Sequence, residues 1–115
     1  MTDDVIDAAV FEELQQNAGA EFVKELVVAF LEEAPGIFAE LRTALDAGDA
    51  DGFRRAAHSI KSNANIFGAH ALAAPARELE LMEVYAPTPN VVALVARLDA
   101  EFARASTALM EMQCG

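Results

Sequence analysis

The spacing of apolar residues is the feature that most restricts the fold of this chain. Near the C-terminus, intervals of four and three residues alternate at Val91, Val95, Leu98, Phe102, Ala105, Leu109 and Met112. An α-helix places residues at these intervals on one face, whereas a β-strand repeats every second residue. A seam of this length is typical of helices that pack nearly parallel in a bundle.

Helical spacing also covers the rest of the chain, and turn residues divide it. Pro35 suits the first turn of a helix, where its missing N–H costs nothing. Gly48 is a suitable stop, Asp49 can cap the helix that follows, and Gly68 ends that helix. Pro75 is tolerable if its helix begins near residue 72. We therefore predict helices over residues 7–16, 20–33, 35–47, 50–67, 72–85 and 89–112.

The connections between these helices determine the expected topology. They are short, and Thr88 as N-cap with Pro89 at the first helical position begins the last helix sharply. Short connections imply antiparallel neighbours. We predict an all-α fold, an up-and-down antiparallel four-helix bundle with a short additional N-terminal helix. At 115 residues, we expect one domain that spans residues 1–115.

Charge and cysteine content exclude several functional classes. The chain carries 19 acidic and 8 basic residues, for a net charge of −11, whereas nucleic-acid and anionic-membrane binding need a basic surface. No apolar run approaches the length of a membrane span, and one cysteine cannot form a disulfide within the chain. We expect a cytoplasmic protein, and a monomer because four helices from one chain can close their own core.

His58 stands out because it lies off the apolar stripe of its helix. That stripe consists of Phe53, Ala57, Ile60, Ala64 and Phe67. Helical spacing instead surrounds His58 with polar residues, at Arg54, Arg55, Lys61, Ser62 and Asn65. Three of the eight basic residues thus fall between positions 54 and 61 of a strongly acidic chain. The alternative interpretation is an ordinary solvated helix face.

The polar stripe suits a histidine that accepts a phosphoryl group. Histidine side chains titrate near pH 6.5, so at neutral pH they are largely uncharged and keep a nucleophilic lone pair. The phosphoryl group carries about two negative charges and needs cations and hydrogen-bond donors. Lys61 and Arg54 can supply positive charge. Ser62 can donate a hydrogen bond and is small enough to let a partner approach.

The segment from Ala57 to Gly68, AHSIKSNANIFG, resembles the histidine-containing phosphotransfer (HPt) domains of multistep phosphorelays. Their signature is a histidine, a lysine three residues later, a small residue, and a glycine after five more. His58, Lys61, Ser62 and Gly68 match these positions, and the resemblance extends from about residue 7 to residue 112. Ser62 stands where glycine is more common.

The resemblance implies a carrier and not an enzyme. In that family, a phospho-aspartate on a receiver domain donates its phosphoryl group to the histidine, and a second receiver takes it. The partners implied are receiver domains, alone or as part of a hybrid histidine kinase. The receiver supplies the divalent metal, so we expect no metal or cofactor here. We expect partner contacts from Arg55, Asn65 and Gly68. Phe22 and Leu26 widen the apolar surface of the helix over residues 20–33, so they can contact the partner or pack against the short N-terminal helix.

Two other interpretations remain open at this point. A helical adaptor that never carries phosphate would need none of the residues around His58. An enzyme of the histidine-kinase type would need a separate ATP-binding domain, and 115 residues leave no room for one. The two histidines, His58 and His70, flank the Gly68 stop and give no grounds for a shared metal site.

Overall fold

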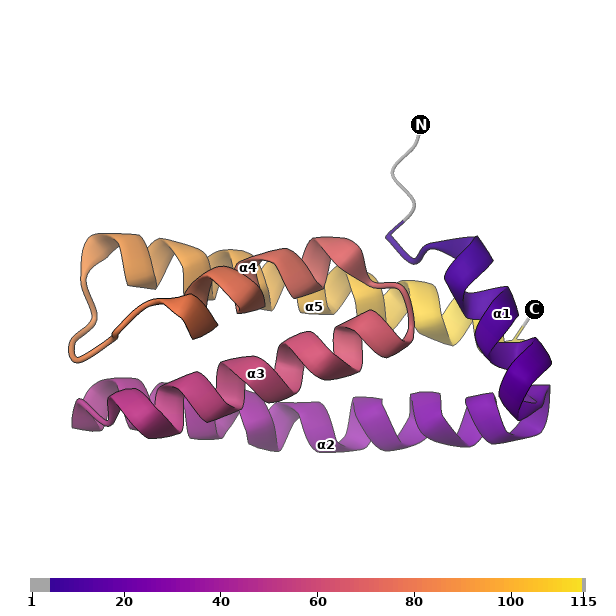
Figure 1. The fold of residues 1–115 in the computed structure, drawn as a ribbon, viewed down its shortest axis with the longest axis horizontal. Helices are drawn as coiled ribbons and strands as arrows, with labels where there is room; N and C mark the ends of the chain where they lie inside the picture. Colours follow the sequence, from indigo (N-terminus) through magenta and orange to yellow (C-terminus); the bar gives the residue numbers. More distant parts are fainter. Residues whose placement is uncertain (1–4, 115) are drawn as a thin grey trace.

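The computed structural model describes the backbone of residues 5–114 and the side chains through Met112. It contains five helices along the chain (Figure 1), namely α1 (Ala8–Ala18), α2 (Ala20–Ala47), α3 (Ala50–Ile66), α4 (His70–Leu81) and α5 (Pro89–Cys114). Within the part of the chain that is described, no helix is both long enough and apolar enough to cross a membrane.

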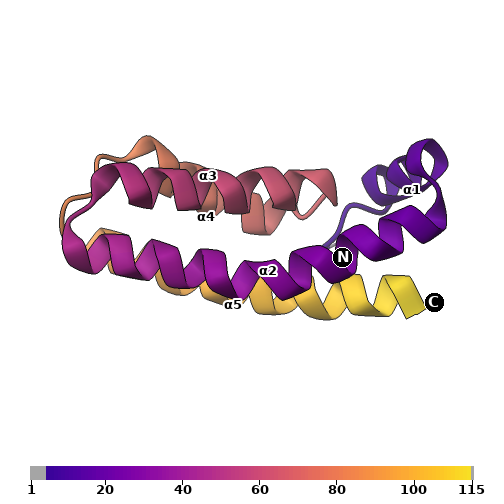
Figure 2. The ribbon, with the colours of Figure 1, turned by 90° about the horizontal axis from the view of Figure 1, so that it is seen from below.

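Four of these helices form an up-and-down antiparallel bundle, which confirms the predicted fold class. Each of α2, α3 and α4 packs against the next helix, and α5 closes the bundle against α2. Seen from below, α4 lies behind α3 and α5 lies behind α2 (Figure 2). The short helix α1 lies at one end of the bundle, beside the start of α2 (Figure 1).

The predicted break at Pro35 is wrong, because residues 20–33 and 35–47 belong to one helix. Helix α2 runs through Pro35 without interruption, and Pro35 is exposed on its surface. A proline inside a helix removes one hydrogen bond and costs about 3 kcal/mol. Burial of apolar side chains before and after Pro35 in the sequence outweighs this cost. The apolar stripe of α2 continues past the proline, and its buried residues are Val27, Phe30, Ala34, Phe38 and Leu41.

The bounds predicted for the next-to-last helix are also wrong at both ends. Helix α4 begins at His70, so Pro75 lies inside it, and the proline ring is buried in the core. The helix ends at Leu81, and Met82 has an extended backbone. A helix continued to Tyr85 would turn Val84 away from the face that carries Leu79. The extended residue instead brings Val84 back into the core.

The core and most of the predicted caps agree with the sequence pattern. The Asp49 side chain accepts a hydrogen bond from the Gly52 amide, and Gly48 adopts a left-handed conformation at the end of α2. The Thr88 hydroxyl accepts from the Val91 amide at the start of α5. All five apolar positions predicted for α3 are buried, at Phe53, Ala57, Ile60, Ala64 and Phe67.

Candidate functional site

His58 lies in the middle of α3, on the side of the helix opposite the core. Its neighbours Ala57 and Ile60 are completely or almost completely buried, whereas the imidazole is 56% exposed. The buried face fixes the position of the helix, so the imidazole is presented on a rigid support. A partner can therefore reach the ring without local unfolding.

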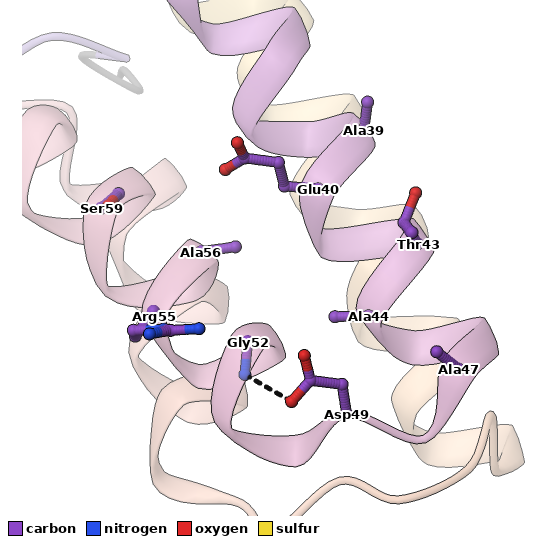
Figure 3. Close-up of a pocket in the computed structure, with 10 residues that line it drawn as sticks. All are labelled: Ala39, Glu40, Thr43, Ala44, Ala47, Asp49, Gly52, Arg55, Ala56 and Ser59. Atoms are coloured by element: carbon purple, nitrogen blue, oxygen red, sulfur yellow. Dashed lines mark hydrogen bonds between the residues drawn. The ribbon is translucent and has the colours of Figure 1, made fainter.

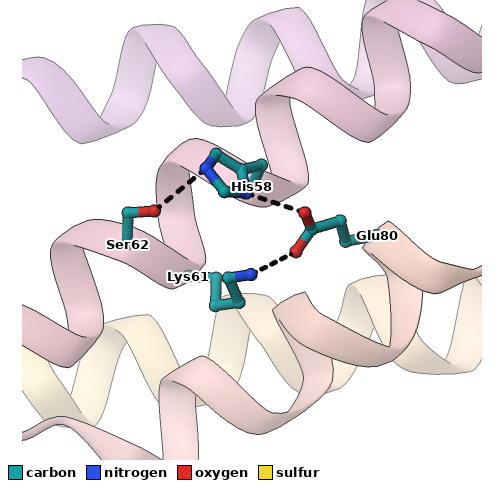
Figure 4. Close-up of polar contacts among 4 residues, drawn as sticks. All are labelled: His58, Lys61, Ser62 and Glu80. Carbon is teal, nitrogen blue, oxygen red and sulfur yellow. Dashed lines mark hydrogen bonds and ion pairs between the residues drawn. The ribbon is translucent and has the colours of Figure 1, made fainter.

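Glu80 of α4 contacts this histidine across the helix pair (Figure 4). The Nδ1 atom of His58 lies 2.7 Å from Glu80 Oε2, and Lys61 Nζ lies 2.7 Å from Glu80 Oε1. One carboxylate thus joins the two residues that the sequence pattern singled out. Sequence reasoning missed Glu80, because it lies 22 residues from His58 and is brought close only by the antiparallel turn.

The contact determines which ring nitrogen can react. An ionised carboxylate only accepts hydrogen bonds, so the proton of a neutral His58 ring lies on Nδ1 and is donated to Glu80. The lone pair is then on Nε2, which faces Ser62 on the side of the ring away from Glu80 (Figure 4). The same arrangement fixes the tautomer of histidines that act as bases or metal ligands elsewhere.

The Glu80 carboxylate is well suited to stay ionised. Its side chain is only 16% exposed. The hydrogen bond from Lys61 is the main cause that lowers the pKa of Glu80 below its ordinary value of 4.5, partial burial opposes the shift, and the His58 contact adds to it. Glu80 therefore carries a negative charge at neutral pH next to the imidazole.

Ser62 lies on the outer side of the ring, one turn after His58. Its Oγ atom is 3.3 Å from His58 Nε2. Since Nε2 holds the lone pair, the serine hydroxyl donates this hydrogen bond. A phosphoryl group on Nε2 would take the place of that contact, with the hydroxyl within reach of its oxygens.

The other predicted residues on α3 surround His58 less closely. Arg54 forms an ion pair with Asp51, one turn earlier on its own helix, and its side chain does not contact His58 in this structure. Asn65 is exposed on the following turns. Arg55 turns toward α2, where it lines a groove (Figure 3).

This groove, of about 540 Å³, runs between α2 and α3 (Figure 3), and His58 is not among the residues that line it. Small side chains form much of its wall, with polar groups around them. The residues that line it are Ala39, Glu40, Thr43, Ala44, Ala47, Asp49, Gly52, Arg55, Ala56 and Ser59. Sequence reasoning did not identify it, because the groove depends on how α2 packs against α3.

The expected partner residues on α2 lie elsewhere. Phe22 is exposed and Leu26 is half-buried, near the start of α2 and beside α1. The α2–α3 turn places His58 level with residues near Ala39, so Phe22 lies about 25 Å further along the helix at 1.5 Å per residue. The structure does not bring Phe22 and Leu26 to the His58 surface.

Gly68, for which a partner contact was expected, is buried in this structure. Its φ is +76°, and a Cβ at this position would come within 2.9 Å of the Val10 Cβ. Its carbonyl accepts a hydrogen bond from the Asp7 amide, 2.9 Å away. Gly68 therefore makes the α3–α4 turn and lets α1 pack closely against it.

His70 is the first residue of α4 and is also exposed. Its Nε2 atom lies 3.2 Å from Asp7 Oδ2, and the same Asp7 side chain accepts from the Ala9 and Val10 amides at the start of α1. This histidine links α1 to α4 and is not part of the Glu80 contact. Among the described residues, no group of three or more histidine, cysteine, aspartate or glutamate side chains could hold a metal ion.

Comparisons with known proteins agree with this geometry. The family model described as the Hpt domain matches residues 25–108. The sensor protein TorS of Escherichia coli (strain K12) is 30% identical over 100 residues, which are 85% of this chain and only 11% of TorS. The crystal structure of histidine-containing phosphotransfer protein B (HptB) from Pseudomonas aeruginosa PAO1 superposes with a TM-score of 0.86. The identity is 28%, over 97% of this chain and 96% of that one. The chain therefore belongs to the Hpt domain family, the histidine phosphotransfer carriers of phosphorelays.

Proposed function

We propose that His58 is the residue that carries the phosphoryl group, on its Nε2 atom. The observation that supports this assignment is the contact between Nδ1 and Glu80, 2.7 Å long. It directs the Nε2 lone pair outward from a rigid helix, where a partner can approach. Of the two histidines in the chain, only His58 combines this contact with a lysine and a serine within one helical turn.

The transfer is a displacement at phosphorus. Nε2 of His58 attacks the phosphorus of an aspartyl phosphate on a receiver domain, the N–P bond forms, and the P–O bond to the aspartate breaks. The released aspartate keeps the electron pair. Such reactions depend mainly on positioning and on charge stabilisation. Lys61 is near enough to turn from Glu80 toward the phosphoryl oxygens, Ser62 donates to them, and Arg54 adds positive charge from the preceding turn.

We further propose that the receiver docks over the groove between α2 and α3. In-line attack requires the receiver aspartate to sit directly above Nε2, so the surface beside His58 must be covered. The groove is lined by Arg55 and Ser59, which flank His58 in the sequence of α3, and its Ala39 and Ala56 walls permit close approach. This surface replaces Phe22 and Leu26 as the expected docking site, while Arg55 remains part of it.

A bulky charge in the groove tests the docking surface. Ala39 is exposed, lines the groove, and does not contact His58. We expect Ala39→Arg to weaken receiver binding at least about tenfold, because a bulky charged side chain would clash with the docked receiver. A tenfold loss of affinity corresponds to about 1.4 kcal/mol of binding free energy. Ala96→Arg, at an exposed alanine on α5, is the matched control and should bind normally. Equal binding by both variants would contradict this surface.

The carrier function itself is tested by phosphotransfer from phosphorylated receiver domains. The wild-type chain should acquire label that is labile in acid and stable in alkali, and His58→Gln should acquire none while keeping its helical circular-dichroism spectrum. Label on the His58→Gln variant would contradict the assignment. Receiver binding without any phosphotransfer would instead favour the alternative of a helical adaptor.

The cellular setting is part of the proposal. We propose a monomeric cytoplasmic carrier without its own ATP site, whose receivers are separate proteins or parts of a hybrid histidine kinase. The monomer is supported by the four bundle helices, which come from one chain and bury a shared core. Sedimentation equilibrium at working concentrations tests it, and a stable dimer would contradict it.

A further inference from the structure

Glu80 is the charged group that contacts the nitrogen of His58 opposite the proposed reactive one. Its Oε2 atom lies 2.7 Å from Nδ1, and its Oε1 atom lies 2.7 Å from the Lys61 ammonium. The carboxylate is largely shielded from water and belongs to a different helix from both partners (Figure 4). These contacts fix the position of the carboxylate relative to the ring before any partner binds.

We propose that Glu80 is a positioning residue that holds the Nδ1 proton of His58 throughout the transfer cycle, and thereby keeps the phosphohistidine in its reactive form. This inference rests on the proposed function of His58. It assigns to Glu80 the control of how long the phosphoryl group stays on the chain.

The electron count explains why the proton matters. Neutral His58 carries its proton on Nδ1 and attacks through Nε2, so the phosphorylated ring has a proton on one nitrogen and phosphorus on the other. No proton is gained or lost in this step, and the ring becomes a cation. When a receiver carboxylate or water attacks the phosphorus, the N–P bond breaks and the electron pair returns to Nε2. The ring then leaves as a neutral imidazole.

Loss of the Nδ1 proton would change the leaving group. A phosphorylated ring without that proton must leave as an imidazolate anion, which is a far poorer leaving group. The negative charge of Glu80 favours the protonated ring, because an opposite charge in contact stabilises a cation. Glu80 therefore extends the pH range over which the phosphoryl group is readily transferred or hydrolysed.

The other charged groups around His58 lie further from Nδ1. On α3, Lys61 contacts Glu80, and Arg54 is paired with Asp51. From α2, Glu40 points into the groove that Arg55 also lines (Figure 3). On α4, Arg77 is exposed one turn before Glu80. Lys61 opposes the effect of Glu80 in the resting protein, and it should turn toward the phosphoryl group once that group is present.

The test compares the decay of phosphorylated protein as a function of pH. Full-length wild type, Glu80→Gln and Glu78→Gln are phosphorylated with phosphoramidate, which needs no partner, and the label is mapped to its residue. The loss of label is then followed from pH 5 to pH 10. Glu78→Gln is the matched control, since Glu78 is an exposed carboxylate of α4 that pairs with Arg97.

The expected result is a shift in the pH at which the decay of the phosphorylated protein slows. Decay should be fast at low pH and should slow once the Nδ1 proton is lost. In Glu80→Gln, the amide oxygen can still accept from Nδ1 but carries no charge. The inflection should then move down by about one pH unit, which makes decay at pH 8 about tenfold slower than in wild type. Glu78→Gln should follow the wild-type profile.

Other outcomes overturn the inference in distinguishable ways. If label on His58 decays with the same inflection in wild type and Glu80→Gln, Glu80 does not hold the proton. A uniform change in rate at every pH, without a shift of the inflection, would assign the effect to a released Lys61 and would also overturn the inference. Lys61→Gln supplies the check, because it retains Glu80 and should keep the inflection at or above the wild-type pH. Label absent from His58 would overturn the proposed function itself.

Discussion

The two histidines of this chain have similar surroundings at first sight, yet they contact their carboxylates through different nitrogens. His58 is 56% exposed and His70 is 62% exposed, and each lies within hydrogen-bond distance of a carboxylate from another segment. His58 uses Nδ1 for this contact, so its Nε2 contacts only the hydroxyl of Ser62, one turn later on the same helix. His70 uses Nε2, the outer nitrogen, to contact Asp7.

The supports of the two rings differ as well. His58 lies mid-helix above a fully buried face, and its carboxylate partner is mostly shielded from water and shared with a lysine. His70 lies at a helix start, and its partner Asp7 is 39% exposed and already caps α1. Exposure and a nearby carboxylate therefore do not identify a phosphoryl acceptor. The nitrogen left free, and the rigidity of its support, distinguish the two sites.

The largest expected effect is on the stability of the fold, and it concerns the turn that precedes His70. Gly68→Ala places a side chain where φ is +76° and where a Cβ would lie 2.9 Å from Val10 Cβ. We expect a loss of about 2 kcal/mol in the free energy of unfolding, measured by urea denaturation, with His58 still phosphorylated in the folded protein.

Gly36→Ala is the matched control for this substitution. Gly36 lies within α2, and a Cβ there would have no neighbour within 4 Å. It should gain about 0.5–1 kcal/mol, because alanine favours the helix. Equal effects of the two substitutions would show that the α1 contact over Gly68 contributes nothing to stability.

A smaller effect is expected on the rate of phosphotransfer, and it concerns the lysine next to His58. Lys61→Ala removes a cation that is partly exposed and one turn from the reacting nitrogen. We expect transfer from a receiver to slow about tenfold, equivalent to about 1.4 kcal/mol of transition-state stabilisation, with little change in unfolding. Lys24→Ala, which removes an exposed lysine on α2, should leave both quantities unchanged. A wild-type transfer rate in Lys61→Ala would remove this lysine from the mechanism.

The smallest expected effect concerns the pH dependence of the His70 contact. The hydrogen bond from His70 is the main cause that lowers the pKa of Asp7 below its ordinary value of 3.8, and the Val10 and Ala9 amides add to it. A lowered pKa means that this contact stabilises the fold above the ordinary value and is lost as the pH falls through the lowered one. His70→Gln should therefore raise the Asp7 midpoint in an NMR titration and leave phosphotransfer unchanged. An unchanged midpoint would contradict the assigned contact.

Local spacing was enough to predict part of the fold and of the site. His58, Lys61 and Ser62 follow one another within a helical turn, and the apolar stripe beneath them repeats at helical intervals. One segment therefore predicts both the helix and the polar cluster on its exposed face. The bundle follows from the same repeat. Glu80 could not be predicted in this way, because its contact depends on how α4 packs against α3 and not on spacing along either helix.

The wrong predictions have a common physical cause. The pattern places Pro35 at the start of a helix and Pro75 in a first turn, yet both lie inside longer helices, because tertiary burial outweighs the one hydrogen bond that each removes. Phe22 lies near the start of α2, at the end of this long helix that is far from His58. Gly68 matched a family motif, but its place beneath α1 shows that a motif position can serve the backbone and not the partner.

The most direct test of the central claim identifies the phosphorylated nitrogen itself. The chain would be labelled with ¹⁵N in its imidazole rings, phosphorylated by a receiver domain, and studied by phosphorus–nitrogen correlation NMR. We expect a single coupling, between phosphorus and Nε2 of His58, with the proton on Nδ1 at neutral pH. Coupling to Nδ1 of His58, or to either nitrogen of His70, would contradict it.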